Sequence, residues 1–191
     1  MHTAPELPLV TSPASALTQV RHGSILPGWM RIFYQIFTHV WKMLNTLQIR
    51  KMLNGAIPNL QVCASNQLSI SSESCYAIIN TKPNTHPGEH WGSLYYKGSG
   101  DKAEYFCSFG GEMERETLEI LYEHGLTGYY YNSIQIQDLQ SGYCGFYCIL
   151  YALSKFLHHH HMDAIVRPFT KDLWGNDEIC INQIVKVIET A

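Results

Sequence analysis

The sequence YCGFYC places two cysteines, Cys144 and Cys148, four residues apart at the start of an apolar segment. Cysteines at this spacing serve as metal ligands, as core side chains, or as one activated nucleophile with a buried neighbour. Structural zinc sites need a further close Cys or His pair, and the sequence has no second CxxC or nearby HxxxH to supply one. The four histidines at 158–161 are typical of a solvated helix end. We therefore expect no metal site.

The two cysteines differ in their position along the predicted helix. Cys148 falls one turn inside a segment that is apolar on nearly every face, so we expect it in the core. Cys144 falls in the first turn, with Ser141 as the expected N-cap, where unpaired backbone N–H groups and the helix dipole stabilise a thiolate. Gly145 leaves room there for an approaching carbonyl group. Position therefore makes Cys144 the candidate nucleophile.

A nucleophilic cysteine needs a general base and donors for the oxyanion. His90 stands just before a predicted strand in HPGEHWGSLYY, and His86 is its rival. A glutamine side-chain amide, together with the backbone N–H of the cysteine, supplies two oxyanion donors. Three glutamines precede the nucleophile and compete for that role on position alone: Gln135, Gln137 and Gln140.

The predicted elements that must position these residues alternate between two periodicities. Helical spacing predicts amphipathic or buried helices at 28–44, 111–125 and 142–157, and a further helix capped by Asn176. Short segments rich in aromatic and β-branched residues predict strands at 75–80, 91–97, 103–109 and 129–136. This order of helices and strands predicts an α+β domain.

Composition limits the function classes. The chain has 191 residues, of which 46% are apolar and 15% charged, and six cysteines too dispersed for a disulfide scaffold. Residues 1–24 have the composition of a flexible arm, which leaves 25–191 as a single domain. The net charge of −3 does not favour nucleic acid, and no segment predicts a membrane span. With no signal peptide, we expect an intracellular protein.

Four motifs in order resemble the adenovirus-type (adenain-like) cysteine proteases, including those of Polinton or Maverick transposons, and more distantly the SUMO-specific proteases. CYAIINT is similar to the strand before the histidine loop of that family, and GEHW to its Gly-x-His-Trp motif. EYFCSFGG is similar to its strand end, and QDLQSGYCGFYC to its Gln, six residues, Cys-Gly-x-x-Cys block. In papain-type enzymes, by contrast, the cysteine precedes the histidine.

The resemblance implies a papain-like cysteine protease fold of the adenain type, with a mixed sheet packed between helices and the nucleophile at the start of a buried helix. It implies that Cys144 is the nucleophile, His90 the general base and later the acid, and Gln137 the oxyanion donor. Trp91 would pack beside the imidazole. The implied reaction is hydrolysis of peptide bonds through a thioester acyl-enzyme.

Substrates and partners follow from the same resemblance. Relatives cut Gly-containing small-residue sites in virion proteins or remove ubiquitin-like modifiers, so a capsid precursor or a ubiquitin-like protein is the implied polypeptide substrate. The implied location is the cytoplasm, the nucleus or a virion. Adenovirus proteases use a viral peptide and DNA as cofactors. The acidic balance of this chain does not favour DNA, no residue identifies a peptide site, and we expect no cofactor, although an activating peptide stays open.

The sequence departs from the family at the third catalytic residue. An Asp or Glu at the end of the strand after the histidine is replaced here by Cys107, and sulfur accepts the imidazole N–H poorly. Glu104 is expected on the opposite sheet face, and neither it nor Asp138 is a convincing substitute. Two interpretations therefore remain: a cysteine endopeptidase, impaired or slow, and an inactive protease fold that binds a peptide or a ubiquitin-like tail.

Overall fold

The computed structural model describes residues 43–70, 74–98 and 100–191. The predicted arm at 1–24 and nearly all of the predicted helix at 28–44 lie outside these residues. The elements in chain order are α3 (Thr46–Leu53), β1 (Gln61–Ala64), the 3₁₀ turn η1 (Ser65–Gln67), β2 (Cys75–Asn80), β3 (Trp91–Tyr96), β4 (Lys102–Phe106), α4 (Arg115–Glu123), β5 (Gly128–Tyr131), α5 (Cys144–His158), α6 (Met162–Val166) and α7 (Gly175–Glu189). Within this part of the chain, no helix is both long and apolar enough to cross a membrane.

The five strands form one mixed sheet in the order β1-β2-β3-β4-β5. The central strands β2, β3 and β4 are antiparallel neighbours, whereas β1 and β5 pair in parallel at the two edges. Strands β2 and β3 read as runs of apolar and aromatic residues because helices cover both faces of the sheet. The predicted α+β class, with a mixed sheet between helices, is confirmed.

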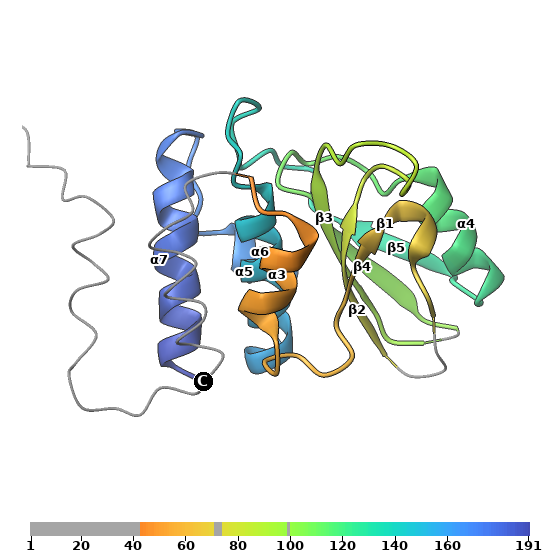
Figure 1. Cartoon of the computed structure of the whole chain (residues 1–191). Helices are drawn as coiled ribbons and strands as arrows, with labels where there is room; N and C mark the ends of the chain where they lie inside the picture. The colour runs from red at the N-terminus through yellow and green to blue at the C-terminus, as the bar shows by residue number, and fades with distance from the viewer. Residues whose placement is uncertain (1–42, 71–73, 99) are drawn as a thin grey trace, which may run out of the picture.

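The helices lie in layers on the two faces of the sheet (Figure 1). From left to right, Figure 1 shows α7, then α5 with α3 and α6, then the sheet, and finally α4. The larger hydrophobic cluster joins α5 and α7 to one sheet face, and a second cluster joins Leu121 of α4 to the other. Helix α5 is therefore enclosed between the sheet and α7.

The enclosed position of α5 explains its composition. Its residues from Cys144 to Lys155 are all buried, so the helix is apolar on every side, as its sequence predicts. Cys144 is its first residue, preceded by the N-cap Tyr143, which makes no capping hydrogen bond with its side chain. The prediction of Ser141 as the cap is wrong because the helix begins only at Cys144, and the Ser141 hydroxyl accepts from the N–H of Tyr143 rather than from a helical residue.

Several boundaries differ from the predicted ones. Strand β5 ends at Tyr131 rather than at residue 136, because the side chain of the following Asn132 turns to the backbone of Cys107. Helix α7 begins after the N-cap Trp174, so the predicted cap Asn176 lies inside its first turn. The structure also contains four short elements that the sequence did not predict: α3, β1, η1 and α6.

Candidate active site

The two cysteines of YCGFYC both face the backbone of Trp91, the first residue of β3. The backbone N–H of Trp91 lies close enough to the sulfur of Cys144 to favour its thiolate form. One helical turn later, the thiol of Cys148 donates to the carbonyl oxygen of Trp91 across 3.1 Å. The first two turns of α5 therefore pack against the start of β3. Cys144 lies next to the backbone of Trp91, the residue that follows His90.

His90 is held at the start of β3 by a sulfur atom and an aromatic ring. Its Nε2 is 3.3 Å from the sulfur of Cys107, and its ring stacks on Phe109 with centroids 4.1 Å apart. Its other nitrogen, Nδ1, is buried and has no hydrogen-bond partner among the described residues. An imidazole fixed through one nitrogen, with the other left open, is arranged as a proton acceptor.

The position of Cys107 is built to receive an anion. Burial raises the pKa of the Cys107 thiol, and the nearby backbone N–H groups of Gly111, Phe109 and Gly110 act in the opposite direction. The turn that aims them is closed by the N–H of Gly110 donating to the carbonyl oxygen of Cys107 across 2.8 Å, and Gly110 takes a φ of +73°, which favours glycine. Converging N–H groups of this kind stabilise a carboxylate, yet the side chain here is a thiol.

Asn132 fixes the same backbone from the neighbouring strand. Its Oδ1 accepts from the N–H of Cys107 at 2.8 Å, and its Nδ2 donates to the carbonyl oxygen of Cys107 at 2.7 Å. A side-chain amide that pairs with both backbone groups of one buried residue continues the strand pairing where β5 has ended. Asn132 therefore helps to fix the backbone of Cys107, and with it the position of the Cys107 sulfur relative to the His90 ring.

The ionisation of the site is governed by burial. Burial lowers the pKa of His90 to about 4. Burial also raises the pKa of the Cys144 thiol, against backbone N–H donors of Trp91, Gly145 and Cys144 that act in the opposite direction. At neutral pH these two shifts favour the neutral forms of the Cys144 thiol and of the His90 imidazole. The expected thiolate at the helix start is therefore absent from this closed state, in which Cys144 is 2% exposed.

Gln137 alone of the three candidate glutamines is buried. Its Nε2 donates to the carbonyl oxygen of Ser141 at 2.7 Å and to the hydroxyl of Ser141 at 3.3 Å, and its Oε1 accepts from Ser108 at 2.5 Å. Gln135 and Gln140 are exposed, and the side-chain N–H of Gln135 donates to the carbonyl oxygen of Gln137. The amide of Gln137 thus lies in the loop before Cys144, directed at Ser141.

Asp177 of α7 continues this network. Its carboxylate accepts from the Ser141 hydroxyl at 2.7 Å and from the Tyr147 hydroxyl at 3.0 Å. Because the Ser141 proton goes to the carboxylate, the hydroxyl oxygen is free to accept from Gln137 and from the Tyr143 N–H. The chain of hydrogen bonds from Asp177 through Ser141 therefore orients the amide of Gln137.

Two predicted supporting residues have other roles. The ring stacked on His90 is Phe109, whereas Trp91 points to the α5 side of the sheet and donates from its indole to the carbonyl oxygen of Leu44 at 2.9 Å. A side chain at Gly145 would meet Leu44, with its Cβ 3.1 Å from that of Leu44. Gly145 therefore allows the chain before α3 to pack against α5, which was not expected.

Neither alternative acid reaches His90. Glu104 lies on the α5 face of β4, where it pairs with Lys155 and accepts from Tyr151, as the strand alternation predicts. Asp138 accepts from the backbone of Gln140 in the loop. The rival base His86 is exposed and bonded to Thr85. In the described part of the chain, no group of three or more His, Cys, Asp or Glu side chains is arranged to hold a metal ion.

Sequence reasoning missed three residues that complete the arrangement: Phe109, Asn132 and Asp177. Phe109 lies in the quoted EYFCSFGG motif, so its aromatic character was visible although its partner was not. Asn132 interrupts an otherwise aromatic strand, which is the kind of break that signals a specific polar contact. Asp177 had no signal, because its partner Ser141 is 36 residues away in the sequence.

Comparison with known proteins gives a fold and no sequence family. No protein-family model and no curated protein sequence matches the chain. A crystal structure of the Se-Met ASFV pS273R protease superposes with a TM-score of 0.52 and 14% identity, covering 74% of this chain and 68% of that chain. A second crystal structure of the ASFV pS273R protease gives a TM-score of 0.50 and 13% identity, covering 74% and 67%. The α+β fold of this chain thus resembles that of a viral cysteine protease.

Proposed function

We propose that the chain is an adenain-like cysteine endopeptidase that uses Cys144 as nucleophile and His90 as general base and acid. The observation that carries the proposal is that His90 contacts Cys107 through Nε2 and keeps a buried Nδ1 without a partner, while the next residue, Trp91, has its backbone N–H against the sulfur of Cys144. An unpaired buried ring nitrogen costs free energy, and a role in proton transfer accounts for it.

The reaction begins with transfer of the Cys144 proton to His90 and attack of the sulfur on the scissile carbonyl carbon. The oxyanion accepts from the backbone N–H of Cys144 and from Nε2 of Gln137, which exchanges its longer bond to the Ser141 hydroxyl for the oxyanion. The imidazolium then protonates the leaving amine. Water, deprotonated by His90, hydrolyses the thioester and releases the enzyme.

The substrate is a polypeptide with small residues at the cleavage site, such as a Gly-Gly sequence in a capsid precursor or in the tail of a ubiquitin-like protein. Cys144 and Gln137 are 2% and 0% exposed, so a peptide reaches them only after the residues over the first turn of α5 move. Leu44 packs on Gly145 in that turn. An activating peptide that shifts this contact is consistent with the closed state.

A second function has one observation in its favour. The thiol at position 107 cannot stabilise an imidazolium as a carboxylate does, and loss of the acid in such triads lowers the rate by up to about four orders of magnitude. A protease fold that has lost activity and binds a peptide tail would tolerate this change. The same experiment distinguishes the two functions.

The test compares the parent chain with Cys107→Asp, Cys107→Asn and Cys144→Ala on fluorogenic Gly-Gly-X peptides. We expect Cys107→Asp to raise kcat/KM at least tenfold, a gain of about 1.4 kcal/mol in transition-state binding, because its carboxylate accepts from the waiting N–H groups and from His90. The matched neutral variant Cys107→Asn should give no such gain, and Cys144→Ala should be inactive. If Cys107→Asp is as inert as Cys144→Ala, the peptidase proposal fails.

A further inference from the structure

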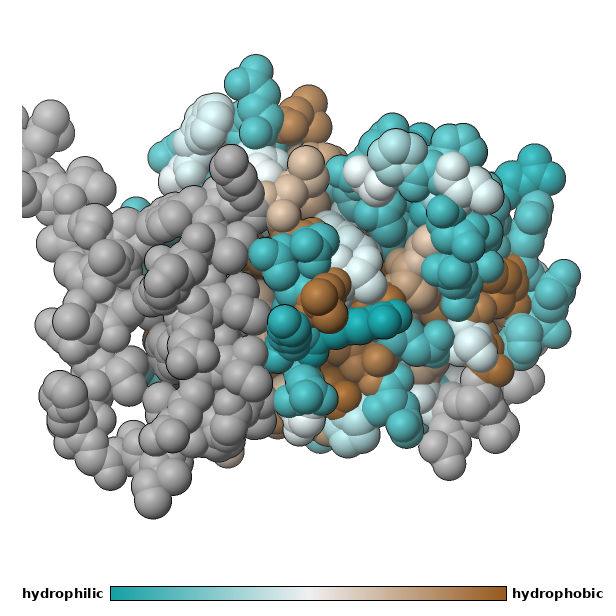
Figure 2. Space-filling model, viewed as in Figure 1, coloured by the Kyte–Doolittle hydropathy of each residue, from teal (hydrophilic) through white to brown (hydrophobic). Residues whose placement is uncertain are grey.

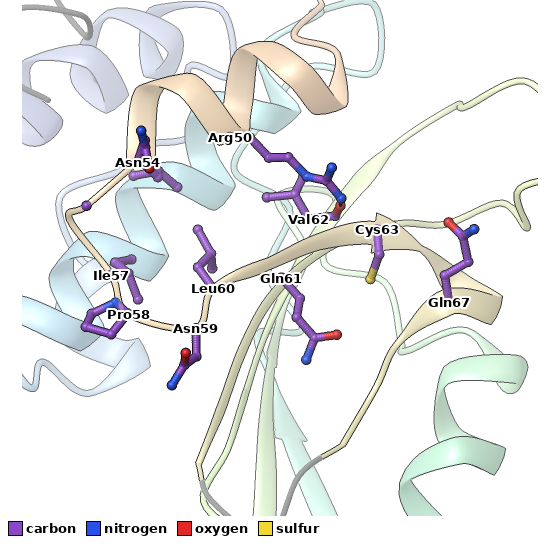
Figure 3. A pocket seen from close by; sticks show the side chains of 12 residues that line it. Arg50, Asn54, Ile57, Pro58, Asn59, Leu60, Gln61, Val62, Cys63 and Gln67 are labelled. Atoms are coloured by element: carbon purple, nitrogen blue, oxygen red, sulfur yellow. Dashed lines mark hydrogen bonds between the residues drawn. The ribbon is translucent and has the colours of Figure 1, made fainter.

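Two adjoining cavities follow α3 and β1 toward the candidate active site. The larger, of about 900 Å³, runs beside β1 (Figure 3), and the smaller has about 470 Å³. They share the lining residues Arg50, Val62, Cys63 and Gln67. The smaller cavity is lined at its other end by Gly88, Glu89 and Trp91, which flank His90 in the chain. We refer to the two cavities together as the Arg50 groove.

The guanidinium of Arg50 is held in place where the cavities meet. Arg50 lies in the last turn of α3, and its Nη2 donates to the carbonyl oxygen of Val62 at 2.7 Å. Figure 3 shows this side chain reaching from the helix to β1. A guanidinium has five N–H donors in a planar fork, so one bond fixes its position and leaves others for a ligand.

The positive charge of Arg50 is not neutralised within the groove. Among the described residues, no carboxylate lies within ion-pair distance of it, whereas Lys82 of the smaller cavity is paired with Glu89 at 3.3 Å. The charge of Arg50 acts on the nearby Cys63 thiol. Burial raises the pKa of Cys63 to about 11, and Arg50 acts in the opposite direction. A fixed guanidinium without a carboxylate partner is prepared to bind one.

The remaining polar lining suits a peptide backbone. The larger cavity is lined by side-chain amides that can both donate and accept hydrogen bonds, namely Asn54, Asn59 and Gln67, and by Gln61, whose amide is bonded to the backbone of Ser69. Apolar side chains such as Ile57 and Leu60 lie between them (Figure 3). Figure 2 shows the same alternation of hydrophilic and hydrophobic side chains on the molecular face over α3 and β1.

We propose that the Arg50 groove binds the polypeptide substrate on one side of the scissile bond, and that Arg50 selects an Asp or Glu side chain there. The inference rests on the proposed peptidase function and adds a substrate class to it. Small residues are accepted at Cys144, and an acidic residue a few positions away pairs with the guanidinium. An extended chain advances about 3.3 Å per residue, so one position along the peptide should meet Arg50.

The test uses two series of Gly-Gly-containing peptides, in which a single Glu or a single Lys is placed at each position in turn. The kcat/KM of each peptide is measured with the Cys107→Asp enzyme. We expect Glu to be preferred over Lys at one position by at least fivefold. Arg50→Ala should abolish the preference, Arg50→Lys should retain part of it, and Arg50→Glu should invert it. The matched control is Lys51→Glu, because Lys51 is the exposed neighbour of Arg50 and lines neither cavity.

A binding measurement separates failure of this inference from failure of the peptidase proposal. Fluorescence anisotropy with Cys144→Ala, and with Cys144→Ala combined with Arg50→Glu, reports selection without cleavage. If no peptide is cleaved but the Glu peptide binds through Arg50, the proposed role of the Arg50 groove stands and the peptidase proposal fails. Equal binding and equal cleavage of the Glu and Lys peptides at every position, or a Glu preference that survives in Arg50→Ala, overturns the role of Arg50.

Discussion

The two nitrogens of His90 have different surroundings, and this difference suits the roles proposed for them. Nε2 faces the Cys107 sulfur at 3.3 Å, where a carboxylate would hold the proton of the imidazole. Nδ1 is the buried atom without a partner. A thiol in place of the acid keeps the geometry of the ring and removes the charge that would favour its protonated form, in agreement with the low pKa of His90.

The charge at position 107 should therefore control the ionisation of Cys144. In the parent chain we expect the pH profile of Cys144 alkylation by iodoacetamide to have a higher midpoint than that of an ordinary thiol, because burial raises the pKa of Cys144. In Cys107→Asp the carboxylate stabilises the imidazolium of His90, which in turn stabilises the thiolate. We expect the midpoint of the rate profile to fall by about one pH unit or more.

The measurement is peptide mapping by mass spectrometry after brief labelling across pH 5–10, which separates Cys144 from the other five cysteines. Cys107→Asn provides the control, since it changes the shape of the side chain as Asp does and adds no charge. A midpoint for Cys107→Asp equal to that of Cys107→Asn would contradict the coupling between positions 107 and 144.

At the scale of elements, the loop between β5 and α5 is attached at both of its ends to parts of the site. Ile136 and Gln137 donate their N–H groups to the carbonyl oxygen of Ser108, next to Cys107. At the other end, Ser141 is bonded to Asp177 of α7. The loop that carries Gln137, the proposed oxyanion donor, is thus fixed between the end of β4 and α7.

We predict that Asp177→Asn lowers kcat about tenfold in the Cys107→Asp background and changes KM little. Removal of a whole oxyanion donor costs about two to three orders of magnitude, and misalignment of a retained donor should cost less. The physical reason is that Ser141 then no longer has its proton fixed away from Gln137. Steady-state kinetics on the Gly-Gly-X peptide gives kcat and KM separately.

A double-mutant cycle with Gln137→Ala distinguishes positioning from general destabilisation. If Asp177 acts through Gln137, the substitution Asp177→Asn should have almost no further effect once the amide is absent. An equal loss in both backgrounds would show that Asp177 supports the fold rather than the oxyanion donor. Thermal unfolding of each variant provides the stability baseline.

The same elements show what a sequence can and cannot predict. Strands β2, β3 and β4 and helices α4, α5 and α7 were predicted because their patterns extend over five or more residues. Strand β1 was not predicted because only Val62 of its four residues is buried, so its sequence shows no alternation of apolar and polar residues. Ser141 has the residue type of a cap, but its true partner lies on α7, and local sequence does not contain that contact.

At the scale of the whole molecule, the buried His90 makes the free energy of unfolding depend on pH. His90 is nine-tenths buried and has a pKa of about 4, against an ordinary value of 6.5. Between these values the unfolded chain binds a proton at this histidine and the folded chain does not. Stability therefore falls as the pH is lowered from about 6.5 to 4, and the full loss from this one group is about 3 kcal/mol.

We predict that His90→Gln removes this loss. The free energy of unfolding, measured by urea titration at pH 7, 5.5 and 4.5, should fall more steeply with decreasing pH in the parent chain than in the variant. Burial raises the pKa values of Asp177 and Glu114, so both carboxyl groups bind protons more readily in the folded chain and contribute with the opposite sign. They are present in both proteins, and the difference between the two curves isolates His90.

Cys107→Asp provides the second arm of this measurement, because its carboxylate should raise the pKa of His90 in the folded chain toward or above the unfolded value. The stability lost by the parent between pH 6.5 and 4 should then shrink or change sign. Parallel curves for the parent and Cys107→Asp would mean that the two side chains do not interact in solution at the 3.3 Å contact. Such a result would remove the physical basis for restoring activity at position 107, whatever the fold of the chain.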